Sequence, residues 1–195
     1  MNKRMRAIML KASPDSYGLI AKLFHWVLAL VILWQLFTGI NLNQMEPSVE
    51  KGQFIWFHQI TGTFLFCGIA LRLLWKFYNR PVFEDSLPKR HRVVSKILQS
   101  LLYLICLWLP LQGSMMTWAD GFDVYLVGMI KIPALIAENK ALYPSFVSIH
   151  LASSVLLLTL SLIHMGAGLY HGYVIKIAIT YGRAWRCAFT AINRR

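Results

Sequence analysis

The chain has 195 residues, of which 57% are hydrophobic and only 14% are charged, and its formal net charge is +12. A soluble globular protein usually carries about 25% charged residues, so this composition disfavours a soluble enzyme. Nucleic-acid binding would need lysines and arginines gathered on a polar face, whereas here these side chains avoid the long apolar runs. We therefore expect a membrane protein whose partner is the lipid bilayer and which binds no nucleic acid.

Four apolar stretches are long enough to cross a hydrocarbon core of about 30 Å, which takes roughly 20 residues. They cover approximately residues 19–40, 54–75, 94–118 and 144–171. Such lengths indicate α-helices, because barrel strands alternate polar and apolar residues over only about 10 positions. The sequence predicts an all-α integral membrane four-helix bundle, with residues 1–195 forming a single membrane domain that ends in a basic tail, 172–195.

The distribution of charge predicts the orientation of this domain. An even number of spans places both termini on one side, and lysines and arginines concentrate on the cytoplasmic side of membrane proteins. The N-terminal segment, the second loop and the tail sum to +14, and the other two loops sum to −2. Both termini are therefore expected to be cytoplasmic, and orientation alone accounts for the high net charge.

Five of the six histidines lie in or at the ends of the predicted spans. They are His25, His58, His150, His164 and His171. An ionisable residue is costly within a membrane, so each histidine is a candidate functional residue. The alternative for any single one is a histidine that is hydrogen-bonded to a neighbouring helix or caps a helix end.

The spacing of four of these histidines places them at two depths. His150 and His164 are fourteen residues apart in the fourth span, so they lie within about 40° of one helix face and about 21 Å apart along it. His58 begins a span that runs parallel to the fourth and matches His150 in depth. His25 begins an antiparallel span and matches His164. The sequence thus predicts two histidine pairs, one in each leaflet.

Two facing neutral imidazoles supply the axial ligands of a six-coordinate haem iron, while the porphyrin supplies four nitrogens. Another metal could use such a pair, but no carboxylate or thiolate lies at the same depth, and the chain has no CxxCH motif for covalent haem attachment. We therefore expect haem b at each pair. Nearby glycines would allow close approach of a flat macrocycle, or could serve helix packing through small residues; they are Gly39, Gly62, Gly166 and Gly168.

Further candidates lie near the ends of the spans. Arg72 and Lys76 are four residues apart on one helix face and could neutralise haem propionates or a quinone headgroup, or simply anchor the helix at the interface. His171 lies seven residues beyond His164 and could donate to a quinone carbonyl, relay a proton, or be an ordinary interfacial histidine. The outer loop 119–143 is a candidate cap or entrance for the outer haem.

Taken together, these segments resemble the prokaryotic cytochrome b561 family of four-helix di-haem membrane proteins. The resemblance covers nearly the whole chain, from Tyr17 to about Trp185. The segments that carry it are YGLIAKLFHWVLALVI around His25, WFHQITG around His58, LRLLWK with Arg72, LLYLICLWLPLQGSMM, ADGFDVYLVGMIKIPALI, and HLASSVLLLTLSLIHMGAGLYHG with His150, His164 and His171.

The resemblance implies two b haems in the bacterial inner (cytoplasmic) membrane, with His25 and His164 holding the cytoplasmic haem and His58 and His150 the outer one. It is strongest to the branch that contains superoxide oxidase, which passes an electron from superoxide to ubiquinone. That branch associates two positions with the quinone, a histidine matched here by His171 and a third-helix position occupied here by Gln99. Glutamine can donate to a quinone carbonyl but does not titrate near neutral pH. Gly172 stands where that branch has a second histidine after the one matched by His171.

The leading hypothesis is a superoxide oxidase-like, quinone-linked oxidoreductase of the respiratory chain, with no catalytic residue assigned. The alternative is a cytochrome b membrane-anchor subunit that relays electrons for a redox partner protein in a larger dehydrogenase or hydrogenase-type complex. A transporter is disfavoured because the spans lack acidic residues. The −2 outer side disfavours an anionic donor unless its three lysines cluster at the haem edge; they are Lys51, Lys131 and Lys140.

Overall fold

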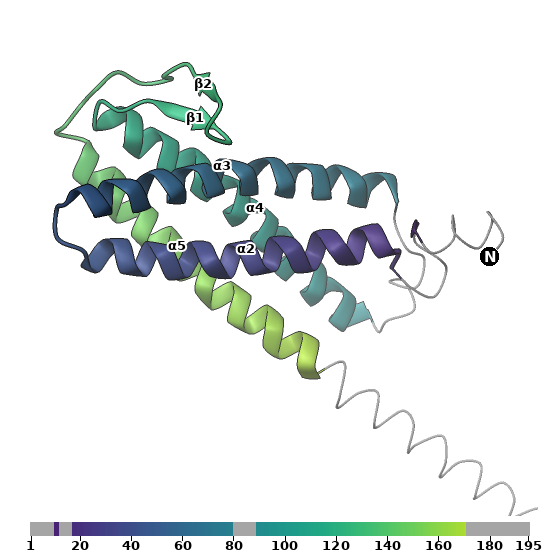
Figure 1. Ribbon diagram of the computed structural model, residues 1–195. Coiled ribbons are helices and arrows are strands. Elements are labelled where there is room, and N and C mark those ends of the chain that lie inside the picture. The colour runs from purple at the N-terminus through teal and green to yellow at the C-terminus, as the bar shows by residue number, and fades with distance from the viewer. Residues whose placement is uncertain (1–9, 12–16, 80–88, 171–195) are drawn as a thin grey trace, which may run out of the picture. The chain divides into compact units, whose positions relative to one another are not determined.

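The computed structural model describes residues 10–11, 17–79 and 89–170 (Figure 1). Its elements are α2 (Leu19–Gln44), α3 (Val49–Tyr78), α4 (Lys89–Ala119), β1 (Val124–Leu126), β2 (Ile130–Ile132) and α5 (Tyr143–Leu169). Each of the four helices is long and apolar enough to cross a membrane, and each corresponds to one predicted span. The prediction of an all-α membrane fold with four spanning helices is confirmed.

Three of the four helices, α2, α3 and α4, are longer than the apolar stretches that predicted them. α3 begins five residues before its predicted span, because the Ser48 side chain caps it by accepting a hydrogen bond from the Lys51 backbone N–H at 3.1 Å. α2 likewise continues to Gln44, so its connection to α3 is a tight turn rather than a long loop. Hydropathy marks the part of a helix that lies in hydrocarbon, whereas capping decides where the helix ends.

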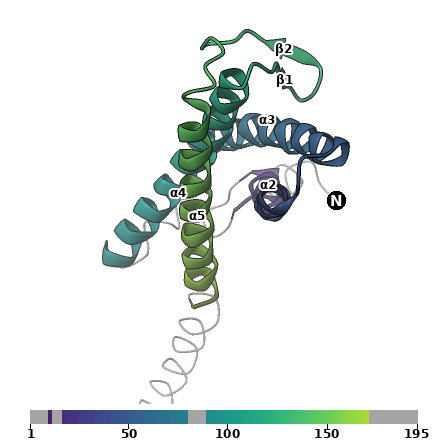
Figure 2. The same cartoon turned by 90° about the vertical axis from the view of Figure 1, so that its left-hand side faces the viewer.

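The chain divides into two compact units, Met1–Leu157 and Leu158–Arg195, with the boundary inside α5. In the first unit α3 packs against both α2 and α4, and Figures 1 and 2 show α2 and α3 side by side. The described part of the second unit is the remainder of α5. The single domain over residues 1–195 stays a prediction.

Few apolar side chains are buried within the first unit. The buried ones include Leu28 of α2 and Leu65 and Ile69 of α3, two helices that pack against each other. Leucines elsewhere on the helices are largely exposed, such as Leu30 at 65% and Leu104 at 68%. A water-soluble monomer rarely exposes apolar surface on this scale, so these faces contact the lipid bilayer.

The predicted outer loop contains an antiparallel hairpin in which Val124 pairs with Ile132 and Leu126 with Ile130. Val127 (φ 51°) and Gly128 (φ 74°) form its turn, and the Val127 backbone N–H donates to the buried Thr63 hydroxyl of α3 at 2.9 Å. β1 contacts both α3 and α4. We call the end of the first unit that carries β1 and β2 the hairpin end.

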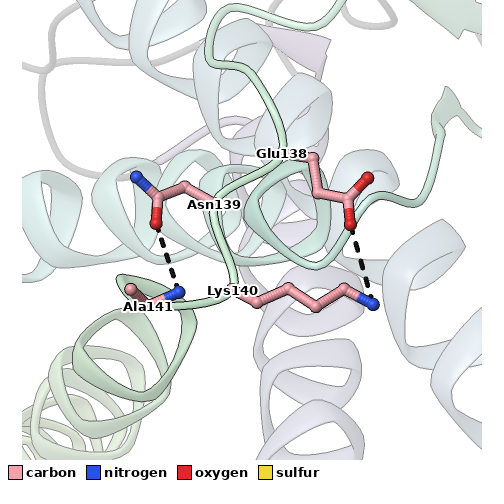
Figure 3. A network of polar contacts seen from close by, with 4 residues as sticks. All are labelled: Glu138, Asn139, Lys140 and Ala141. Atoms are coloured by element: carbon pink, nitrogen blue, oxygen red, sulfur yellow. Dashed lines mark hydrogen bonds and ion pairs between the residues drawn. The ribbon is translucent and has the colours of Figure 1, made fainter.

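The segment after the hairpin is organised around Asn139 (Figure 3). Its backbone N–H donates to the Ala119 carbonyl at the end of α4 at 2.9 Å, and its side-chain Oδ1 accepts from the Ala141 N–H at 3.2 Å. On the other side of the chain, the Lys140 ammonium lies 3.6 Å from the Glu138 carboxylate. Asn139 therefore joins the end of α4 to the start of α5.

Candidate functional site

The first unit brings His58 of α3 and His150 of α5 together near the hairpin end. Their ring centres are 6.3 Å apart, and the ring planes are inclined at 72°. Both side chains are half-buried. These are the two histidines that the sequence placed at one depth.

His58 is held by Thr38, a buried residue of α2. The Thr38 Oγ1 lies 3.0 Å from the His58 Nδ1, and the same hydroxyl donates to the Gln35 carbonyl at 3.0 Å. A hydroxyl has only one proton to donate. With that proton assigned to the Gln35 carbonyl, Thr38 accepts from His58. In this assignment the imidazole carries its proton on Nδ1 and keeps a lone pair on Nε2.

His150 is held in the same manner by Gln112 of α4. The Gln112 Oε1 lies 2.7 Å from the His150 Nδ1, while the Gln112 Nε2 donates to the Phe146 carbonyl. Because the second contact fixes which end of the amide faces the ring, the carbonyl oxygen must accept from an Nδ1–H. Gln112 is only 1% exposed, so water does not compete for this bond.

A second amide ties α2 to α3 beside the first ring. The Gln35 Nε2 donates to the carbonyl of His58 at 2.6 Å, and its Oε1 accepts from the Thr61 hydroxyl at 2.6 Å. A Cβ added at Gly62 would lie 3.3 Å from the Gln35 Nε2. This glycine therefore provides the space that the glutamine occupies.

Two other glycines lie against the imidazoles themselves. A Cβ added at Gly39 would lie 3.4 Å from the His58 Cε1, and one at Gly113 would lie 3.2 Å from the His150 Cε1. Each follows directly the residue that accepts from the same ring, Thr38 or Gln112. Close approach of the backbone thus brings each acceptor within reach of its histidine.

The geometry of the pair was compared with that of a metal held between two imidazoles. For two imidazoles whose Nε2 atoms face one metal ion in a straight line, two metal–nitrogen bonds of about 2 Å each and a ring radius of about 1.2 Å on either side separate the ring centres by about 6.4 Å. The observed separation is 6.3 Å. Among the described residues no three His, Cys, Asp or Glu side chains gather into a metal site, so a bare ion would have only two ligands here. The arrangement fits a haem iron, to which a porphyrin contributes four further nitrogens.

The other predicted haem ligands are described separately. The His25 ring lies beside that of Trp26 in α2, with centroids 5.3 Å apart. His25 belongs to the first unit and His164 to the second, so their pairing stays a prediction. His171 lies outside the described residues.

Arg72, Lys76 and Gln99, which were predicted to contact a quinone or haem propionates, lie close together at the end of the first unit opposite the hairpin. The Lys76 ammonium of α3 donates to the Gln99 Oε1 of α4 at 2.7 Å. The Arg72 guanidinium lies 5.6 Å from the centre of the Tyr103 ring, and the Lys76 ammonium lies 5.4 Å from it. These separations allow cation–π attraction.

Four functional candidates were missed in the sequence: Thr38, Gln35, Gln112 and Tyr103. Glutamines within apolar spans were the available signal, because a buried amide needs partners in the membrane. Tyr103 lies four residues after Gln99 and so shares its helix face.

The three lysines expected near the hairpin end do not form a cationic cluster with one another. Lys131 pairs with Asp123 at 2.7 Å, and Lys140 pairs with Glu138 at 3.6 Å. The hydrogen bond to Asp123 raises the pKa of the exposed Lys131. Lys51 donates to the Met45 carbonyl at 2.6 Å. Two of the three positive charges are thus balanced by an adjacent carboxylate.

Comparisons with known proteins identify the family of the chain. A family model described as prokaryotic cytochrome b561 matches residues 16–180, a range that includes all six histidines. Cytochrome b561 homolog 2 of Escherichia coli (strain K12) is 24% identical over 170 residues, which cover 84% of this chain and 88% of that relative.

Proposed function

The chain belongs to the prokaryotic cytochrome b561 family of membrane b-type haem electron-transfer proteins, and from this premise we propose that it binds two b haems and carries electrons between a donor at the hairpin end and ubiquinone at the opposite end. When bound, each haem supplies reversible one-electron chemistry. The residues of the chain bind the haems, orient them and exclude water from them.

The 6.3 Å separation of the His58 and His150 rings carries this proposal. Both imidazoles present Nε2 lone pairs, because Thr38 and Gln112 accept from their Nδ1–H groups. They are the proposed axial ligands of the haem nearer the hairpin. Neutral imidazoles are the form that iron requires, and their other ring nitrogens are already bonded, as in most histidine–metal sites.

His25 and His164 are the proposed ligands of the second haem. Support comes from the sequence, since His164 follows His150 by fourteen residues in α5. Fourteen helical residues rise about 21 Å, which would place one haem in each leaflet. Two haems at these depths would conduct electrons across most of the hydrocarbon core.

The proposed quinone contacts are His171 and the cluster of Arg72, Lys76 and Gln99 around Tyr103. The cluster joins α3 to α4 through the Lys76–Gln99 hydrogen bond. Gln99 accepts there through its oxygen, so its NH₂ group is directed away as a donor for a carbonyl. Because its cations match the +14 side of the chain, we place this cluster and both termini at the cytoplasmic face of the inner membrane.

The identity of the outer donor depends on charge. A small anion such as superoxide is attracted by local positive potential, but Lys131 and Lys140 are each paired with a carboxylate. This observation favours a second candidate function, an electron-relay subunit whose donor is a redox partner protein of a dehydrogenase or hydrogenase-type complex. Both candidates use the same haems and the same quinone end.

Rapid mixing of the purified oxidised protein with superoxide distinguishes the candidates. A superoxide oxidase would show haem reduction with release of O₂, followed by reoxidation when a ubiquinone analogue is added. The matched variants Lys131→Gln and Asp123→Asn remove one charge of opposite sign from the same pair, so they should slow and accelerate that reduction, respectively. If superoxide does not reduce the haems but a copurifying dehydrogenase does, the protein is the relay subunit. Haem-free protein would contradict both.

A further inference from the structure

All four helices contribute one polar or ligating side chain at the level of the outer histidine pair. His58 and His150 come from α3 and α5, and their partners Thr38 and Gln112 come from α2 and α4. Thr38 is 6% exposed and Gln112 is 1% exposed. Polar side chains buried this deeply in apolar helices are costly unless they are bonded, and both Thr38 and Gln112 are bonded to an imidazole of the pair.

The hydrogen-bond directions leave only one role for each partner. The Thr38 proton goes to the Gln35 carbonyl, and the Gln112 NH₂ goes to the Phe146 carbonyl. Both side chains can therefore only accept from the imidazoles. Rotation of either ring by a half-turn would exchange Nδ1 with Cδ2 and lose this bond.

We propose that Thr38 and Gln112 are positioning residues that hold His58 and His150 as Nδ1–H tautomers and thereby set the affinity and the reduction potential of the outer haem. The inference rests on the proposed function, since it requires that these histidines bind haem. When an oxygen accepts a hydrogen bond from Nδ1–H, the imidazole becomes a more basic ligand through Nε2. A more basic axial ligand stabilises oxidised iron and so lowers the reduction potential.

Gln112 should affect the reduction potential of the outer haem more than Thr38 does. Its amide is fixed at both ends, and it is shielded from water that could replace it. A hydrogen bond in such a low-dielectric environment is stronger than one in water. The Thr38 hydroxyl is held at only one other point, by the Gln35 carbonyl, and a hydroxyl can rotate to suit a changed neighbour.

The test is a potentiometric titration of the haem absorbance of the whole purified protein, together with the rate of haem transfer to apomyoglobin. Gln112→Leu removes the acceptor and should raise the potential of one haem component while leaving the other unchanged. Gln112→Glu keeps an acceptor and should leave the potential unchanged or lower it. Removing a residue that holds a metal ligand through a hydrogen bond typically changes metal affinity about 10- to 100-fold. Haem loss from Gln112→Leu should therefore accelerate by that factor.

Thr38 provides a second arm should Gln112→Leu fail to fold. Thr38→Val has nearly the same shape without the hydroxyl and should raise the same component, whereas Thr38→Ser should restore the wild-type potential. Gln59→Leu is the matched control, because Gln59 joins α3 to α4 through Thr117 at 3.1 Å without contacting either imidazole. Its titration should be that of the wild type.

The outcomes separate this inference from the proposed function. Wild-type potentials and wild-type haem retention in both Gln112→Leu and Thr38→Val would overturn the positioning role while leaving the haem site intact. Full haem content in His58→Ala would instead overturn the haem site itself. Equal and same-direction shifts in Gln112→Leu and Gln112→Glu would show that Gln112 acts only by packing, and would also overturn the role.

Discussion

The two halves of the outer histidine site hold their imidazoles by different arrangements. Between α2 and α3 two residues hold His58: Thr38 accepts from its ring, and Gln35 donates to its carbonyl. Between α4 and α5 a single residue does both, since Gln112 accepts from the His150 ring and donates to the Phe146 carbonyl. One half therefore distributes its polar contacts, and the other concentrates them in one buried amide.

This difference indicates where the site is vulnerable. If Thr38 is lost, Gln35 still ties α2 to α3, and Thr61 still donates to that glutamine. If Gln112 is lost, α5 loses the ring contact and the backbone contact together. Substitutions on the α4–α5 side should therefore lower the free energy of unfolding more than the corresponding substitutions on the α2–α3 side.

The largest expected effect is a difference in unfolding free energy between Gln112→Ala and Gln35→Ala. Gln112→Ala leaves the His150 Nδ1–H without its acceptor, and an unpaired buried polar group costs about 1–3 kcal/mol. Gln35→Ala costs less, because the Thr61 hydroxyl can then direct its one proton to the Phe57 carbonyl, 2.7 Å away, and so keeps a partner. Denaturant unfolding of the detergent-solubilised protein, followed by haem absorbance, measures both; equal losses would contradict the contrast between the two halves.

A smaller effect is expected from the glycines that face the rings. Alanine normally stabilises a helix relative to glycine by roughly 0.5–1 kcal/mol, but here the new Cβ meets an imidazole. Gly113→Ala should reduce haem occupancy more than Gly39→Ala, because its Cβ would lie 3.2 Å rather than 3.4 Å from the ring carbon.

Gly52→Ala serves as the control for both glycine variants. No heavy atom lies within 4 Å of a Cβ built there, so haem content should be unchanged and the helix slightly more stable. Haem-to-protein absorbance ratios after purification give the order of the three variants. If Gly39→Ala loses more haem than Gly113→Ala, the α4–α5 half is not the tighter one.

The smallest effect is expected at the surface of the hairpin. Lys131 and Asp123 form an exposed pair, and such pairs contribute little to stability because water and salt screen them. The pair raises the pKa of Lys131, so its contribution is fully present below the ordinary lysine pKa of about 10.4 and is lost only as the pH rises past the raised value. Thermal unfolding of Lys131→Gln should therefore track the wild type, with a small constant offset, from about pH 6 to about pH 9. A loss of stability in Lys131→Gln as large as that in Gln112→Ala would show that surface charge, rather than the buried amide, stabilises this end of the protein.

The sequence was sufficient to predict features that depend on composition and spacing. Hydropathy located the four helices, and the spacing of His58 and His150 placed them at one depth, because helical rise per residue is fixed. The sequence also selected Arg72 and Gln99, which the structure places beside Tyr103 and Lys76, respectively, while their role toward a quinone stays a prediction.

The sequence could not predict which side chains meet across the helices. Depth follows from residue number, but the rotation of each helix about its axis depends on packing, and rotation decides that Gln112 rather than Gln59 faces His150. The hairpin was missed because its strands have three residues each, too few to show an alternating pattern. Its position depends on contacts with residues far away in the sequence, among them the hydrogen bond from the Val127 N–H to the Thr63 hydroxyl.

The sharing of one haem by His58 and His150 is tested most directly by counting haems with the pyridine haemochrome assay. We predict two b haems per wild-type chain and one in each of His58→Ala and His150→Ala. The double variant His58→Ala/His150→Ala should also retain one, because both ligands belong to the same iron. A double variant without haem, beside single variants that each keep one, would show that the two histidines serve different haems and would contradict the pairing.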